Sequence, residues 1–113
     1  MHELGLCDAL LKKLREVAEE NELEGVNFMS LEIGSLSGVV PSFMEDCWQA
    51  VIDGTEFSRT KLFVTSVPGK ARCADCSCEF EVDLDKMFCP QCSGRRLIPV
   101  SGNDITITQI EGY

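Results

Sequence analysis

Apolar side chains recur at helical spacing in two separate stretches of the chain. In residues 4–20 they follow the i, i+3, i+4, i+7 rule opposite a face of Lys, Arg and Glu, which predicts an amphipathic helix ending near Asn21. A second stripe follows Pro41, a residue suited to the first helical position, and ends before Gly54. The stripe residues, all expected in the core, are Cys7, Leu10, Leu11, Leu14, Val17, Ala18, Phe43, Met44, Cys47, Trp48, Val51 and Ile52.

Three further stretches have the alternating, β-branched or aromatic character of strands. In the first, Met29, Leu31 and Ile33 alternate toward one face, and in the last Ile110 breaks the alternation, which favours a bulge near Gln109. The order is helix, strand, helix, strand, cysteine-rich segment, strand. We therefore predict an α+β fold, with two helices on a three-stranded mixed sheet and a ribbon inserted before the last strand. The expected strands are residues 26–34, 60–67 and 104–111.

The cysteine-rich segment contains two CxxC pairs separated by twelve residues. Each pair forms a tight knuckle that turns both sulfurs toward one point, and the spacer suits a hairpin that brings the knuckles together. Four thiolates then form a closed tetrahedral site, with Zn–S distances near ~2.3 Å. Two disulfides are the alternative, but they are typical of secreted proteins. The spacing predicts structural zinc at Cys73, Cys76, Cys89 and Cys92.

Cys78 leaves the choice of ligands open, because it can pair with Cys73 or Cys76. We prefer Cys73 with Cys76, since their two-residue spacer matches the second pair; Cys78 is then a free thiol beside the site. Phe80 and Phe88 are expected to form the small core of the ribbon. Four basic residues either offset the negative charge of the thiolates, the preferred interpretation, or form a nucleic-acid patch: Arg72, Lys86, Arg95 and Arg96.

Length, net charge and cysteine content limit the classes of protein to which this chain can belong. The 113 residues are enough for one domain, or for a small domain with a satellite, and the formal net charge of −9 argues against electrostatic binding of nucleic acid or an anionic membrane. No run approaches the roughly 18 apolar residues of a membrane span, and the start lacks the pattern of a signal peptide. Seven cysteines, an odd number, indicate a reducing cytoplasm.

The first three residues, Met1, His2 and Glu3, offer a second set of metal donors. The α-amine, the deprotonated His2 amide and the His2 imidazole can bind one ion through fused rings, and in-plane nitrogen donors suit square-planar nickel(II) or copper(II). The Glu3 side chain can add an oxygen. A terminal histidine that is simply solvated is the alternative, and His2 is the only histidine of the chain.

Taken together, the start MHELGLC, the segment LEIGSLSGVVP and the spacing CxxC-x12-CxxC resemble the HypA/HybF nickel metallochaperones of [NiFe]-hydrogenase maturation. The resemblance implies a cytoplasmic protein, not an enzyme, with structural zinc on the four cysteines and transient nickel at Met1, His2 and Glu3. It divides the chain into a nickel-binding α/β domain (residues 1–69 and 100–113) and a zinc-binding ribbon (residues 70–99). The implied partners are a HypB-type GTPase and the hydrogenase large subunit, with urease maturation in some relatives.

One feature departs from this pattern. Some members of the family carry an acidic nickel ligand in the loop after the first strand, whereas residues 35–41 contain no carboxylate and the first acids after them are Glu45 and Asp46. Two other functions stay open from the residues alone: a zinc-ribbon module that binds protein or nucleic acid, and a rubredoxin-like electron carrier. No Ser/His/Asp set, phosphate loop or paired-carboxylate cleft indicates catalysis.

Overall fold

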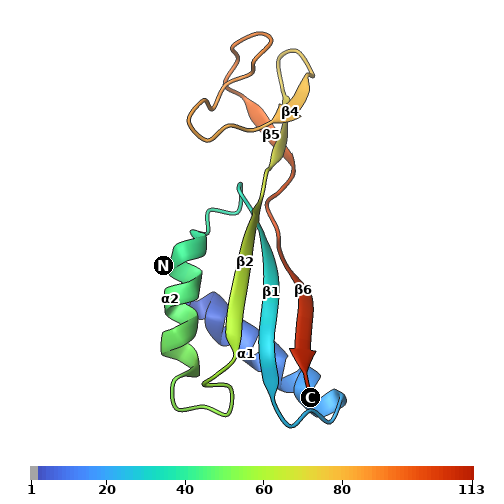
Figure 1. Ribbon diagram of the computed structural model, residues 1–113. Helices are drawn as coiled ribbons and strands as arrows, with labels where there is room; N and C mark the ends of the chain where they lie inside the picture. The colour runs from blue at the N-terminus through green and yellow to red at the C-terminus, as the bar shows by residue number, and fades with distance from the viewer. Residues whose placement is uncertain (1–2) are drawn as a thin grey trace. The chain divides into compact units, whose positions relative to one another are not determined.

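The computed structural model describes residues 3–113, which form two helices and six strands (Figure 1). These residues fall into two compact units. The helix–sheet unit comprises the chain as far as Glu32, Val39–Thr65 and Thr106–Tyr113, and the ribbon unit comprises Ile33–Gly38 and Ser66–Ile105. Neither helix in the described part of the chain is long and apolar enough to cross a membrane.

The first helix, α1 (Glu3–Glu20), matches the prediction. Its buried residues, Cys7, Leu11 and Leu14, are spaced i, i+4, i+7 and so lie on one face. The helix ends where the Asn21 side chain donates a hydrogen bond to the Val17 carbonyl (2.8 Å) and Glu22 adopts a left-handed φ of 53°. A left-handed residue just after the last turn is a common way to stop a helix.

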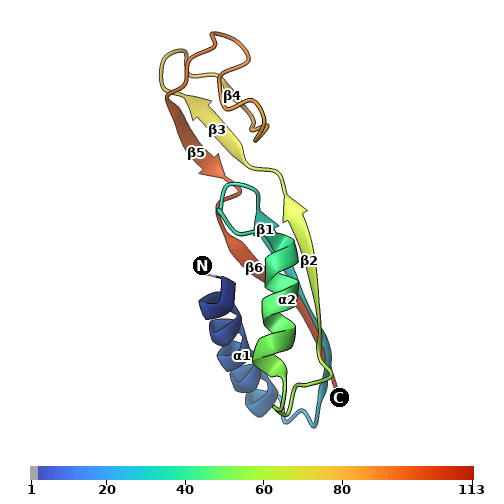
Figure 2. The same cartoon turned by 90° about the vertical axis from the view of Figure 1, so that its left-hand side faces the viewer.

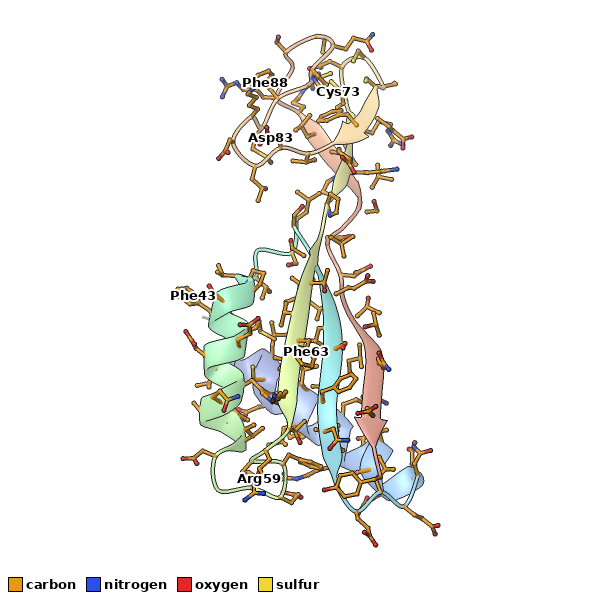
Figure 3. All side chains as sticks on the ribbon, in the orientation of Figure 1. Phe43, Arg59, Phe63, Cys73, Asp83 and Phe88 are labelled. Carbon is orange, nitrogen blue, oxygen red and sulfur yellow. The ribbon has the colours of Figure 1, made fainter. Side chains whose placement is uncertain are left out.

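The second helix, α2 (Pro41–Ile52), begins with its proline in the first turn. Met44, Trp48 and Ile52 face the core with no more than 1% exposure, and the Trp48 indole donates to the Thr60 carbonyl at 3.0 Å. Phe43 is 56% exposed and points away from the helix (Figure 3), so the prediction that it joins the core is wrong. The helical stripe read from the sequence is wider than the face that α2 buries.

Both helices lie on one face of a three-stranded sheet (Figure 2). The strand order is β2 (Lys61–Val67), β1 (Val26–Gly34), β6 (Ile105–Gly112). β1 runs parallel to β2, because Thr60 bonds Val26 at their starts and Ser35 bonds Val67 at their ends. It runs antiparallel to β6, since Gly25 pairs with Tyr113. The predicted mixed sheet and α+β class are confirmed.

The two faces of this sheet differ in their surroundings. Met29, Leu31 and Ile33 of β1 are at most 1% exposed and form the centre of the core. The opposite face carries Phe28 and Phe63, whose rings meet edge to face with centroids 5.4 Å apart. In β6 the half-buried positions change phase after Ile107, where the sequence loses its alternation.

The ribbon unit contains a second sheet, in which β3 (Lys70–Cys73) lies between β4 (Glu79–Glu81) and β5 (Leu97–Ser101). Both neighbours are antiparallel to β3, and the register places Lys70 opposite Glu81 on one side and Ser101 on the other. Ala71 and Val82 are buried here. Phe88 is 37% exposed, so its predicted place in a small core is wrong.

Within the ribbon unit, three segments of the chain approach one another closely at Gly34, Gly69 and Gly102. The Leu36 amide donates to the Gly102 carbonyl at 2.9 Å, and the Gly69 amide donates to the Ser35 hydroxyl at 2.9 Å. A methyl group on Gly34 would overlap the Gly102 carbonyl, and Gly102 has a left-handed φ of 84°. This close approach explains why residues 33–38, the end of β1 and the loop that follows it, belong to the unit of the ribbon.

Candidate metal centres

Four thiols of the ribbon unit converge on one point. The sulfurs of Cys73, Cys76, Cys89 and Cys92 all lie within 4.8 Å of one another. Two of the separations, Cys73 to Cys92 and Cys76 to Cys89, are 3.6 Å. Tetrahedral coordination with metal–sulfur bonds of ~2.3 Å places the sulfurs ~3.8 Å apart, so the set fits a four-coordinate ion. All seven cysteines lie in the described part of the chain and are free thiols.

The two knuckles that supply these sulfurs have the same hydrogen-bond pattern. In each, the amide two residues after the first cysteine donates to its sulfur at 3.4 Å, from Asp75 to Cys73 and from Gln91 to Cys89. The amide four residues after it donates to its carbonyl at 2.9 Å. That fourth residue is left-handed in both, with φ of 65° at Ser77 and 63° at Ser93. Such backbone donors orient thiolate ligands and stabilise their charge.

This equivalence defines the role of Cys78. Its carbonyl accepts the Cys73 amide at 2.9 Å, as the Gly94 carbonyl accepts the Cys89 amide at 2.8 Å, so each closes a knuckle through its backbone. The Cys78 sulfur lies 3.7 Å from the Glu79 carbonyl and is not among the four grouped sulfurs. At Gly94 a side chain would meet Asp75 at 2.6 Å and the Cys92 sulfur at 3.2 Å.

The pKa values of Cys76 and Cys89 are shifted in opposite directions. Burial opposes ionisation of Cys89, but amide donors from Cys92 and Gln91 outweigh it and lower its pKa to about 7. The backbone of Cys78 favours the thiolate of Cys76, but burial and the neighbouring thiols raise its pKa to about 12. Cys89 therefore forms a thiolate more readily than Cys76, and metal binding to the four sulfurs releases the protons that the thiols still carry.

One arginine beside the cluster forms an ion pair, and a second lies opposite an acid in the sheet register. The Arg96 guanidinium bonds the Asp75 carboxylate, which raises the arginine pKa, and the Ala74 amide donates to the Arg96 carbonyl at 2.8 Å. Arg72 lies opposite Glu79 in the β3–β4 register. Arg96 thus neutralises a carboxylate beside the cluster. That the basic residues offset the charge of the thiolates stays a prediction.

The N-terminal candidates are only partly described. Met1 and His2 lie outside the described residues, and Glu3 is the first residue of α1. Its carboxylate accepts a hydrogen bond from the Val40 amide at 3.4 Å, immediately before α2 begins. Glu3 also lines an open groove of about 620 Å³ together with Leu4, Gly5, Asp8, Phe43 and Cys47.

Comparison with known proteins identifies the family of this chain. Residues 1–112 match the family model described as hydrogenase/urease nickel incorporation, metallochaperone, hypA. The chain belongs to the HypA family. The predicted resemblance is thereby confirmed, and the family consists of metallochaperones that act as maturation factors rather than enzymes.

Individual HypA relatives cover almost the whole chain. Hydrogenase maturation factor HybF of Klebsiella pneumoniae is 33% identical over 112 residues, 99% of both chains. Hydrogenase maturation factor HypA 2 of Bradyrhizobium diazoefficiens is 33% identical over 111 residues, 98% of both chains. The solution structure of the Ni metallochaperone HypA from Helicobacter pylori has a TM-score of 0.68 at 22% identity, covering 99% of this chain and 97% of that one, which shows a shared fold.

The placement of Cys78 in this HypA-family chain leads to a first prediction. We expect Cys78→Ser to leave the metal content of the ribbon at the wild-type level, because the residue acts through its carbonyl, which serine retains. Elemental analysis of the purified variant measures this. A loss of half the bound metal would mean that the Cys78 sulfur is a ligand.

Proposed function

We propose that this protein binds Ni(II) at its N-terminus, through Met1, His2 and Glu3, and delivers it for maturation of the [NiFe]-hydrogenase active site. The observation that carries the proposal is the family match, which includes the Met-His-Glu start. It favours a nickel chaperone over the two alternatives from the sequence, a zinc-ribbon interaction module and an electron carrier.

The chemistry of the first residues supports this assignment. The α-amine, the His2 amide nitrogen and the His2 imidazole are three nitrogen donors that can share one plane, the geometry that Ni(II) favours. Glu3 supplies an oxygen at the start of α1, and the hydrogen bond from Val40 orients its carboxylate. A site at a chain end has few protein ligands around it, which suits an ion that must be passed on.

The ribbon cysteines have a different role in this proposal. Cys73, Cys76, Cys89 and Cys92 hold Zn²⁺, whose preference for four thiolates in a tetrahedron matches the arrangement of the sulfurs. Four protein ligands leave no open coordination position, so the ion stabilises the ribbon rather than taking part in a reaction. In this division residues 70–99 form the zinc-binding ribbon domain, and residues 1–69 with 100–113 form the nickel-binding domain.

The proposed partners are the proteins that exchange nickel with this protein or receive nickel from it. A HypB-type GTPase exchanges nickel with this protein, and the immature hydrogenase large subunit receives it; urease maturation factors are a second destination. All of these steps take place in the cytoplasm, where the seven cysteines stay reduced. The net charge of −9 is consistent with protein partners rather than nucleic acid.

Nickel titration of the untagged protein at several pH values tests the proposal. The unperturbed imidazole titrates near pH ~6.5 and the α-amine near ~7.8, and nickel binds only their deprotonated forms, so affinity should fall steeply from about pH 8 to pH 6. An extension of several glycines before Met1 converts the Met1 amine into an amide and keeps the new chain end away from His2, which should weaken binding severely. Equal nickel affinity with and without this extension would refute the N-terminal site.

A further inference from the structure

Two cysteines outside the ribbon lie where α1 packs against α2. Cys7, in the second turn of α1, is 0% exposed, and its sulfur lies 3.5 Å from the Met44 carbonyl of α2. Cys47 follows Met44 by three residues and therefore projects from the same side of α2. The carbonyl that Cys7 contacts is thus one turn from Cys47.

The two thiols differ in access to solvent. Cys47 is half-buried and lines the groove of about 620 Å³, whose other walls come from the first turns of α1 and from Phe43. A small molecule can enter this groove and reach Cys47, whereas Cys7 is fully buried. Burial, with a further contribution from the nearby Cys47 thiol, raises the pKa of Cys7 to about 11. Cys47 is therefore the thiol of the two that an oxidant in solution reaches first.

We propose that Cys7 and Cys47 form a redox-sensitive thiol pair, which hydrogen peroxide converts into a disulfide that joins α1 to α2. The Cys47 sulfur attacks one peroxide oxygen, the O–O bond breaks, and Cys47 becomes a sulfenic acid while the thiol proton leaves with hydroxide as water. The Cys7 sulfur then attacks the Cys47 sulfur, the S–O bond breaks, and a second water leaves with the Cys7 proton. Two electrons pass from the two thiols to one peroxide.

The proposed disulfide would join the first turns of α1 covalently to α2. The disulfide closes a loop from residue 7 to residue 47 and fixes the beginning of α1 four residues after Glu3. Oxidation would thereby restrain the segment that leads to the N-terminus without involving the four sulfurs of the ribbon. This inference concerns the two helices alone and does not depend on where nickel binds.

Peptide mapping of the metal-loaded protein tests the proposal. After mild peroxide treatment and alkylation of free thiols, trypsin releases Cys7 in residues 1–12 and Cys47 in residues 16–59, separate from the ribbon cysteines in 73–86 and 87–95. We expect a species with the summed mass of the first two peptides minus two hydrogens, which disappears on reduction.

Two single substitutions show, in the same peptide mapping, whether the linked species comes from Cys7 and Cys47. Cys47→Ser should eliminate the linked species, and its half-buried position makes it the safer change for folding than one at Cys7. Cys78→Ser, the matched control at an unrelated cysteine, should leave the linked species unchanged. Peroxide treatment that carries Cys47 to a sulfinic acid while Cys7 stays free, or that links either residue to Cys78, would overturn the proposal.

Discussion

Replacing Cys89 with serine is expected to abolish metal binding by the ribbon and to unfold it. Cys89 is fully buried, lies 3.6 Å from Cys76, and has its pKa lowered to about 7 by amide donors that outweigh its burial. A serine hydroxyl does not ionise at neutral pH, so the site would lose one of its four thiolate ligands. Small metal-bound modules depend on the ion for their folding, and this ribbon buries few apolar side chains of its own.

Elemental analysis should show the metal falling from one per chain to below about 0.1 in Cys89→Ser. In NMR spectra the signals of residues 70–101 should collapse to unfolded positions while those of α1 and α2 stay dispersed. Cys78→Ser is the matched control and should keep both metal and signals. A Cys89→Ser protein with full metal content would refute the assigned ligand set, and a red, redox-active wild type would indicate iron in place of zinc.

His2→Ala is expected to remove nickel binding while leaving the fold and the ribbon metal intact. The substitution deletes the imidazole and with it one fused chelate ring, so nickel affinity should fall by about 100-fold or more. Among the described residues the buried side chains begin at Cys7, so we expect the core to keep its packing. Hydrogenase activity in cells carrying only the variant should be lost, and added nickel should partly restore it.

Calorimetric titration with Ni(II), together with elemental analysis for zinc, separates this outcome from unfolding. His2→Gln, which keeps a polar side chain of similar length without imidazole, should behave like His2→Ala. Glu45→Ala changes the first acid after the loop that precedes α2 and should keep wild-type nickel affinity. A loss of affinity in this variant would indicate an acidic ligand on the helix. Tight 1:1 nickel binding by His2→Ala would place the site elsewhere in the chain.

The periodic elements could be predicted closely from the sequence. β1 and α2 have the expected limits because Gly34, Pro41 and the residues before Gly54 end or begin elements through backbone constraints that act locally. The apolar spacing likewise predicted the faces of α1 and β1. Phe43 was misplaced because a helical stripe shows which side is apolar but not how wide a strip the partner elements cover.

The ribbon could be predicted only in part. The cysteine spacing indicated the four-sulfur site, but not that β3 and β5 pair as strands. β3 has only four residues, and β5 contains Pro99, which is tolerated because β5 is an edge strand. Aligning the two knuckles, CADCSC with CPQCSG, would have matched Cys78 to Gly94 and indicated its structural position.

The pairing of Lys70 with Ser101 has a consequence for how the chain reaches its native state. β6 is the last strand to be synthesised, yet it must pair with β1 across the whole ribbon segment. Closing a flexible connection of that length is entropically unfavourable, and folding the ribbon first joins its two ends and shortens the effective connection. The saving is about 1–2 kcal/mol of loop-closure free energy. Metal uptake by the ribbon should therefore accelerate completion of the β2–β1–β6 sheet.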